Sequence, residues 1–115
     1  MHDGEAFGRN YELPNLTAYN ETCAAIAMVY LNQRMFMLHG DSKYIDCLER
    51  TLYNGVISGM SIDGGRFFYP NPLASDGKYR FNADNTLERQ LGSDVHAVLP
   101  ISVVLYLLSP AIYML

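Results

Sequence analysis

The most apolar stretch in the first half of the chain runs from Asn20 to His39 and predicts a helix. Its apolar residues cover nearly the whole circumference at helical spacing, which is typical of a helix buried inside a large protein. Asn20 is a good N-cap residue, and Gly40 follows His39 as a C-cap. The sequence therefore predicts an interior-type helix bounded by these residues.

A second helix is predicted from about Lys43 to Ser58, with Asp41 or Ser42 as its N-cap. Its apolar residues form one stripe at helical spacing: Tyr44, Ile45, Leu48, Leu52, Val56 and Ile57. Because the link Gly40-Asp41-Ser42 is so short, the two helices should form an antiparallel hairpin.

The residues outside the helices predict irregular or short extended segments. Met1 to Thr17 reads as irregular. Met60–Ile62 and Arg66–Tyr69, joined by Asp63-Gly64-Gly65, predict a short β-hairpin. Leu73 to Gln90 is polar and rich in turn residues, and predicts extended loops or a second short hairpin. The expected fold is mainly α, a helical hairpin with a short β-hairpin.

The chain changes character at Leu91, and Ala97 to Leu115 is almost unbroken in its apolar character. This tail is a marginal candidate for a transmembrane helix. Pro100 and Pro110 interrupt it, and no basic residue flanks it, so a membrane partner is not favoured. One alternative function is thus a small membrane-anchored protein with a C-terminal span, and another is a small soluble α-helical binding protein.

Composition narrows the classes of function. The chain has 115 residues, 17% of them charged, and a net charge of −4 without a basic patch, which argues against a nucleic-acid partner. Cys23 and Cys47 lie on separate predicted helices and are too few for a disulfide framework, so a reduced or metal-bound state is expected. Met1 to Glu5 is polar and predicts no signal peptide, so the localisation of the protein stays unknown and the chain as written is expected in the cytoplasm.

Glu21 and Cys23 bring metal-binding atoms to the start of the first predicted helix. The helix dipole favours a carboxylate there and lowers the pKa of a thiol. Both groups bind Zn²⁺-type ions, but two ligands are half of a tetrahedral site. The structural alternative is an N-capped helix with a small buried cysteine. A second carboxylate, Glu5, lies between Gly4 and Gly8, where it can approach a ligand closely or simply be solvated.

Several separate motifs resemble one known family. They are GEAFGRNYELPN (Gly4–Asn15), YNETCA (Tyr19–Ala24), GDSKYIDCLERTLYN (Gly40–Asn54) and GGRFFYPNPL (Gly64–Leu73). Together they are similar to glycoside hydrolase family 127, the β-L-arabinofuranosidase-like family, from about Met1 to Gln90 without an evident gap. The resemblance implies a retaining glycosidase with an (α/α)6-barrel catalytic domain and β-sandwich parts, of which residues 1–90 would be a fragment.

The resemblance also implies roles for individual residues. Glu21 and Cys23 match the metal ligands of the family's Glu-x-Cys motif. Glu5, in the matching Gly-Glu-Ala-Phe-Gly stretch, would be the general acid/base that protonates the leaving oxygen. Tyr69, in the FFYPNP motif, is expected to contact the sugar. The implied cofactor is Zn²⁺, which would hold a cysteine as thiolate, and the implied substrate is an arabinofuranoside-type carbohydrate.

The family's two further cysteines, one of them the nucleophile, lie in a downstream GCACCP motif that this chain lacks. Gly92 to Ile101 can be encoded by GGT TCG GAT GTG CAT GCT GTC CTT CCA ATA. With one preceding T, the shifted frame reads WFGCACCPSN, the sequence expected there. We therefore hypothesise a one-nucleotide deletion near Leu91, with residues 91–115 translated out of frame and Met1 an internal methionine used as a start. The resulting fragment is expected to be inactive alone, with weak or absent Zn²⁺ binding.

Overall fold

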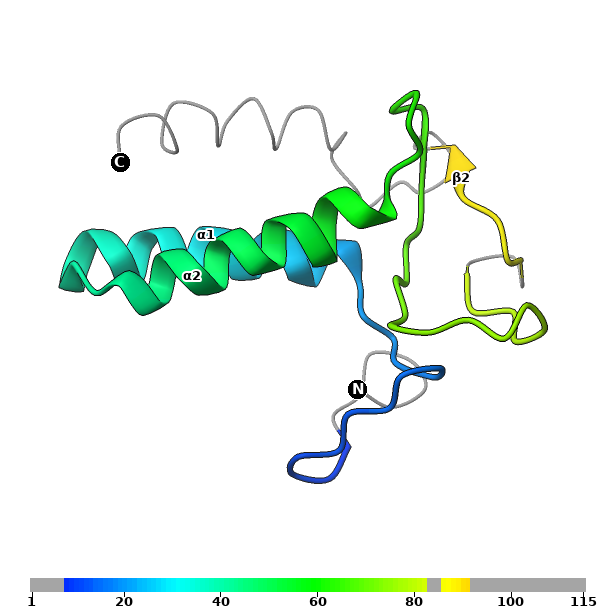
Figure 1. The fold of residues 1–115 in the computed structure, drawn as a ribbon, viewed down its shortest axis with the longest axis horizontal. Helices are drawn as coiled ribbons and strands as arrows, with labels where there is room; N and C mark the ends of the chain where they lie inside the picture. Colours follow the sequence, from blue (N-terminus) through cyan, green and yellow to red (C-terminus); the bar gives the residue numbers. More distant parts are fainter. Residues whose placement is uncertain (1–7, 83–85, 92–115) are drawn as a thin grey trace.

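The computed structural model describes residues 8–82 and 86–91. Two helices, α1 (Thr22–His39) and α2 (Ser42–Thr51), form an antiparallel hairpin (Figure 1). The helical path continues beyond α2 through a π-helical turn, η1 (Leu52–Val56), and a 3-10 turn, η2 (Ile57–Gly59). The prediction of a mainly α chain built on a helical hairpin is confirmed.

The start of α1 differs from the prediction, because Asn20 is not the N-cap. Asn20 and Glu21 are still extended, and the Asn20 carbonyl accepts a hydrogen bond from the Asn71 amide at 2.9 Å. This pairing delays the helix, so that Glu21 occupies the N-cap position and its side chain makes no capping bond within the described chain. Cys23 still lies in the first turn, as predicted.

The turn between the helices follows the prediction closely. Gly40 has a φ of 67°, and its N–H donates to the Phe36 carbonyl at 2.7 Å. Glycine commonly follows the last helical turn in the left-handed backbone conformation, because it has no Cβ atom that would clash there. Asp41 caps α2 by accepting a hydrogen bond from the Lys43 amide at 3.0 Å. These two ends set the antiparallel course of the hairpin.

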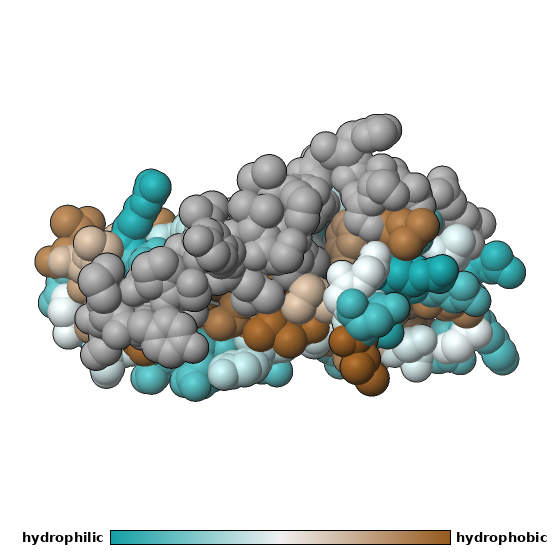
Figure 2. All heavy atoms as spheres, turned by 90° about the horizontal axis from the view of Figure 1, so that it is seen from above, coloured by the Kyte–Doolittle hydropathy of each residue, from teal (hydrophilic) through white to brown (hydrophobic). Residues whose placement is uncertain are grey.

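The core lies between the helices and the first strand. Its buried apolar residues are Val29, Leu48, Leu52, Val56 and Phe67. Other large apolar residues of α1 remain exposed, among them Leu31 at 54%, Met37 at 76% and Leu38 at 75% of their surface. Brown apolar atoms are accordingly visible on the outer surface, beside polar ones (Figure 2). The apolar side chains of α1 therefore extend beyond the face of the helix that packs in the core.

The strands are short and pair over a longer distance in sequence than predicted. β1 (Arg66–Phe67) pairs antiparallel with β2 (Gln90–Leu91), with Arg66 opposite Leu91 and Phe67 opposite Gln90. The predicted hairpin survives as a single Met60–Phe67 bridge around its turn. Next to that bridge, the Ser61 amide donates to the Arg66 carbonyl at 2.8 Å, and the Ser61 hydroxyl accepts from the Arg66 amide at 2.9 Å. The turn prediction is confirmed, whereas the strand partner was missed.

In residues 8–82 and 86–91, no helix is both long and apolar enough to cross a membrane. The predicted acid/base Glu5 and the apolar tail from Ala97 to Leu115 lie outside the described residues.

Candidate metal and sugar site

Backbone pairing brings the predicted site residues together. The extended residues before α1 run antiparallel to the segment that follows β1, with a bridge between Glu21 and Pro70. The Thr22 amide donates to the Tyr69 carbonyl at 2.9 Å, and the Asn71 amide bonds to Asn20. Tyr69, distant from Glu21 in the sequence, is thereby placed beside the start of α1.

The Glu21 carboxylate is unusual in its hydrogen bonding. Interaction with this carboxylate, together with partial burial of the ring, raises the pKa of the Tyr69 phenol well above its ordinary value, because a neighbouring negative group disfavours the ionised phenol. The Oε1 atom of Glu21 is buried and has no hydrogen-bond partner among the described residues. A buried carboxylate oxygen without a partner is costly unless a ligand completes it.

Cys23 is the second residue of α1 and carries a partly buried thiol that is in no disulfide. It lies near enough to Tyr69 for its charge to influence the pKa of the phenol, as does that of Glu21. Carboxylate oxygen and thiolate sulfur are both ligands that Zn²⁺ prefers. The residues present therefore fit half of a tetrahedral zinc site. In the described part of the chain, no group of three or more histidine, cysteine or acidic side chains could hold a metal.

Tyr69 is fixed from several sides. Its ring packs edge-to-face against Tyr19, with centroids 6.2 Å apart and an interplanar angle of 73°. Its amide donates to the side-chain oxygen of Asn82 at 3.2 Å, and its carbonyl is bound by Thr22. Asn82 is itself buried and donates to the Glu88 carbonyl at 2.8 Å. The Tyr69 ring is consequently held beside the start of α1 by both backbone and ring contacts.

A pocket of about 420 Å³ opens beside Glu21. Its polar lining includes Arg50 and Asn54 from α2 and η1, and Asn71 from the segment after Tyr69. These pocket residues were not predicted from the sequence. A signal was available, because Arg50 and Asn54 are four residues apart and share one helical face. Their convergence on Glu21 depends on the hairpin geometry, which the spacing alone does not give.

Comparison with known proteins decides the family. Residues 1–96 match the family described as Beta-L-arabinofuranosidase, GH127 catalytic domain. The chain belongs to the GH127 family. Among characterised members it is similar to a "Non-reducing end beta-L-arabinofuranosidase" of Bifidobacterium longum subsp. longum, with 47% identity over 72 residues, which are 63% of this chain and 11% of that protein. The resemblance found in the motifs is confirmed.

Solved structures of glycoside hydrolases share the fold of this chain. One is a GH127 β-L-arabinofuranosidase, Ara127N, from Geobacillus stearothermophilus T6, with a TM-score of 0.76 and 44% identity over 96% of this chain and 18% of its own. Another, described as a glycoside hydrolase, has a TM-score of 0.73 and 35% identity over 95% of this chain and 20% of its own. The chain therefore spans a fifth or less of the length of these relatives.

Proposed function

We propose that this chain is the part of a GH127 retaining glycosidase that contributes the acid/base and half of the metal site, and that it has no activity alone. The observation that carries the proposal is the buried Oε1 of Glu21 at the N-cap of α1, which has no hydrogen-bond partner among the described residues and lies two residues before Cys23. The family assignment supports it, since family 127 carries its metal ligands in a Glu-x-Cys motif of this kind. The substrate class would be a β-L-arabinofuranoside.

Each residue has a distinct role in this proposal. Glu21 and Cys23 would hold Zn²⁺, and a bound zinc ion would keep cysteine sulfur deprotonated at neutral pH. Glu5 would donate a proton to the leaving-group oxygen and afterwards accept one from water. A retaining glycosidase also needs a nucleophile to attack the anomeric carbon. In the family that nucleophile is a downstream cysteine, which this sequence lacks after Cys47.

The pocket beside Glu21 supports a carbohydrate as substrate. Arg50, Asn54 and Asn71 supply hydrogen-bond donors and acceptors around an otherwise apolar wall formed by α1 residues such as Ala24 and Met28. Sugar binding sites combine such polar groups with apolar surface, because each ring presents both hydroxyl groups and C–H faces. The pocket is open, in keeping with a site that other parts of a longer enzyme would complete.

Zinc titration of the purified chain tests the metal part of the proposal. We expect weak Zn²⁺ binding in calorimetry, because two protein ligands leave half of the coordination to water. The Cys23→Ser substitution should abolish this binding. The matched control is Cys47→Ser, which removes the exposed thiol of α2 and should leave the affinity unchanged.

Two outcomes would contradict the metal assignment. Equal loss of binding in Cys47→Ser would show that zinc binds thiols without selecting the Glu21–Cys23 pair. Tight stoichiometric binding that depends on Cys23 would show that more than two side chains of this chain act as ligands. Turnover of an arabinofuranoside by the chain alone would overturn the proposed lack of activity.

A further inference from the structure

The side chain of Asn71 is held in one orientation by a short chain of hydrogen bonds. The Ser58 hydroxyl donates to the Asn54 carbonyl at 2.6 Å, and Nδ2 of Asn71 donates to Oγ of Ser58 at 3.0 Å. Because the single hydroxyl proton is used on Asn54, the Ser58 oxygen can only accept from Asn71. The NH₂ group of Asn71 must therefore face Ser58, and its carbonyl oxygen, Oδ1, faces the other way.

The backbone of Asn71 is constrained as well as its amide. Asn71 lies between Pro70 and Pro72, and a residue before proline is largely restricted to extended conformations. Its N–H donates to the Asn20 carbonyl at 2.9 Å. The side-chain amide also packs over Gly59, where an added Cβ would lie 3.5 Å from Nδ2. Asn71 is therefore preorganised from both its backbone and its side chain.

The oriented Oδ1 is an acceptor without a donor among the described residues, and the Asn71 side chain is partly exposed. Asn71 lines the pocket of about 420 Å³ beside Glu21, whereas Ser58 does not line it. A ligand that covers such an acceptor without supplying a donor loses free energy, because the acceptor is then unpaired. Oδ1 therefore suits a ligand that carries a hydroxyl group.

Asn71 also lines a smaller pocket of about 240 Å³. The walls of this smaller pocket are mainly apolar, with Phe68 and Phe81 among them. A hydroxyl group both donates and accepts hydrogen bonds, so it is best placed where several polar groups are near. The pocket beside Glu21 offers such groups, including Arg50, and is therefore the better place for a ligand that donates to Asn71.

We propose that Asn71 is a specificity-determining residue of the sugar pocket, and that its Oδ1 accepts a hydrogen bond from one hydroxyl group of a β-L-arabinofuranoside. Ser58 is the positioning residue that keeps the amide in the orientation this requires. The inference rests on the proposed function and adds to it selection for a hydroxyl group at one position of the sugar. A sugar without that hydroxyl group leaves Oδ1 without a donor.

Removal of single hydroxyl groups from the ligand tests this assignment. The probes are methyl β-L-arabinofuranoside and its three monodeoxy analogues, titrated into the full 115-residue chain and followed by NMR chemical shifts. Loss of one hydrogen bond typically weakens binding about 3- to 10-fold. The wild-type chain should bind at least one analogue more weakly than the parent sugar by this factor.

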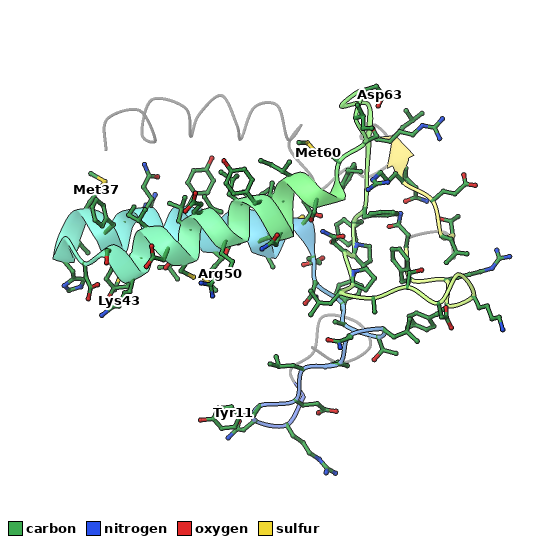
Figure 3. The ribbon with its side chains drawn as sticks, in the orientation of Figure 1. Tyr11, Met37, Lys43, Arg50, Met60 and Asp63 are labelled. Atoms are coloured by element: carbon green, nitrogen blue, oxygen red, sulfur yellow. The ribbon has the colours of Figure 1, made fainter. Side chains whose placement is uncertain are left out.

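The Asn71→Ala substitution identifies the partner of that hydroxyl group. It keeps the backbone N–H that bonds to Asn20, so the segment should keep its place. The variant should bind the parent sugar about 3- to 10-fold more weakly, and one analogue that the wild-type chain disfavours should now bind as well as the parent. Ser58→Ala releases the amide and should reduce the same discrimination in part. The matched control is Asn10→Ala, an exposed amide next to Tyr11, which projects away from the helices (Figure 3), and its binding should be unchanged.

The same titrations separate failure of the inference from failure of the proposed function. If Asn71→Ala weakens binding of the parent and all three analogues by one common factor, the inference is overturned, because a damaged pocket wall affects every ligand alike. Equal affinity of the wild-type chain for all four sugars would overturn it too. A wild-type chain that binds none of them would reject the carbohydrate pocket of the proposed function and, with it, the role of Asn71.

Discussion

Thr22 joins the start of α1 to the segment that carries Tyr69. Its amide donates to the Tyr69 carbonyl, and its hydroxyl donates to the Phe68 carbonyl at 2.6 Å. The residue has no exposed surface. These two bonds tie the start of α1 to the backbone of residues 68 and 69, so a residue without chemistry of its own holds the two parts of the candidate site together.

The Thr22→Val substitution should destabilise the chain by about 1–3 kcal/mol, because it keeps the side-chain shape but leaves the Phe68 carbonyl without its donor. The free energy of unfolding in urea measures this cost. In the control, Thr51→Val, the lost hydroxyl bonds to the Cys47 carbonyl at an exposed position, and a change within about 0.5 kcal/mol is expected. Equal losses of stability in the two variants would show that the buried Thr22 hydrogen bond contributes no more than the exposed Thr51 bond.

At the scale of elements, α1 and η1 approach closely at Gly55. A Cβ added to Gly55 would lie 3.0 Å from the Cβ of Ala25, closer than packed atoms normally come. Both residues line the pocket beside Glu21. The glycine is therefore required by the crossing of two helical segments, not by a special backbone angle.

The Gly55→Ala substitution should push η1 away from α1. Overpacking of this kind costs about 1–3 kcal/mol, partly offset by about 1 kcal/mol from the better helix propensity of alanine. Urea unfolding should show a net loss of stability. Adding Ala25→Gly should recover part of it, so that the double variant is more stable than the sum of the single changes predicts. Strict additivity would mean that the two positions do not meet.

Sequence patterns predicted where helices and strands form better than they predicted which distant segments pair with each other. The hairpin follows from local signals, since Gly40 and Asp41 have the same roles in the structure as in the prediction. The Asn20 cap was wrong because the pairing of Asn20 with Asn71 overrides a local preference. The β1–β2 pairing was missed for the same reason, as no periodicity encodes which distant strand is the neighbour.

In the candidate site, too, the residues were predicted from motifs but their arrangement in space was not. Glu21, Cys23 and Tyr69 were found through motifs, and the structure places Tyr69 beside the start of α1. This proximity could not be predicted, because it depends on the antiparallel pairing of Glu21 with Pro70. Arg50 and Asn54 were missed since they become pocket residues only once α2 and η1 are packed against α1.

At the scale of the whole molecule, the chain and its relatives differ greatly in size. The chain covers 18% of the Geobacillus enzyme, and α1 exposes Leu31, Met37 and Leu38. Exposed apolar residues of this kind mark a surface for further protein contact. We interpret this surface as the one that neighbouring parts of a complete GH127 enzyme would cover, in agreement with the interior-type pattern of the sequence.

The last prediction concerns the reading frame after Gln90. Restoring one nucleotide at the codon for Leu91 should yield a chain that continues WFGCACCPSN and regains the missing cysteines. Sequencing the downstream DNA is the direct measurement, since the shifted frame should continue to read as GH127. In the protein expressed from the restored frame, Glu5→Gln should lower turnover of arabinofuranosides about 10²- to 10⁴-fold, the usual worth of general acid/base catalysis.

The chemistry of the leaving group provides the control for this substitution. A leaving group that is stable as an anion needs little protonation, so Glu5→Gln should slow its release much less than that of an alkyl leaving group. Cys23→Ser should instead remove metal and activity together for both substrates, because metal binding requires the thiolate. Equal loss on both substrates in Glu5→Gln would remove the acid role from Glu5. Downstream DNA without a family-like reading in the shifted frame would reject the frame hypothesis itself.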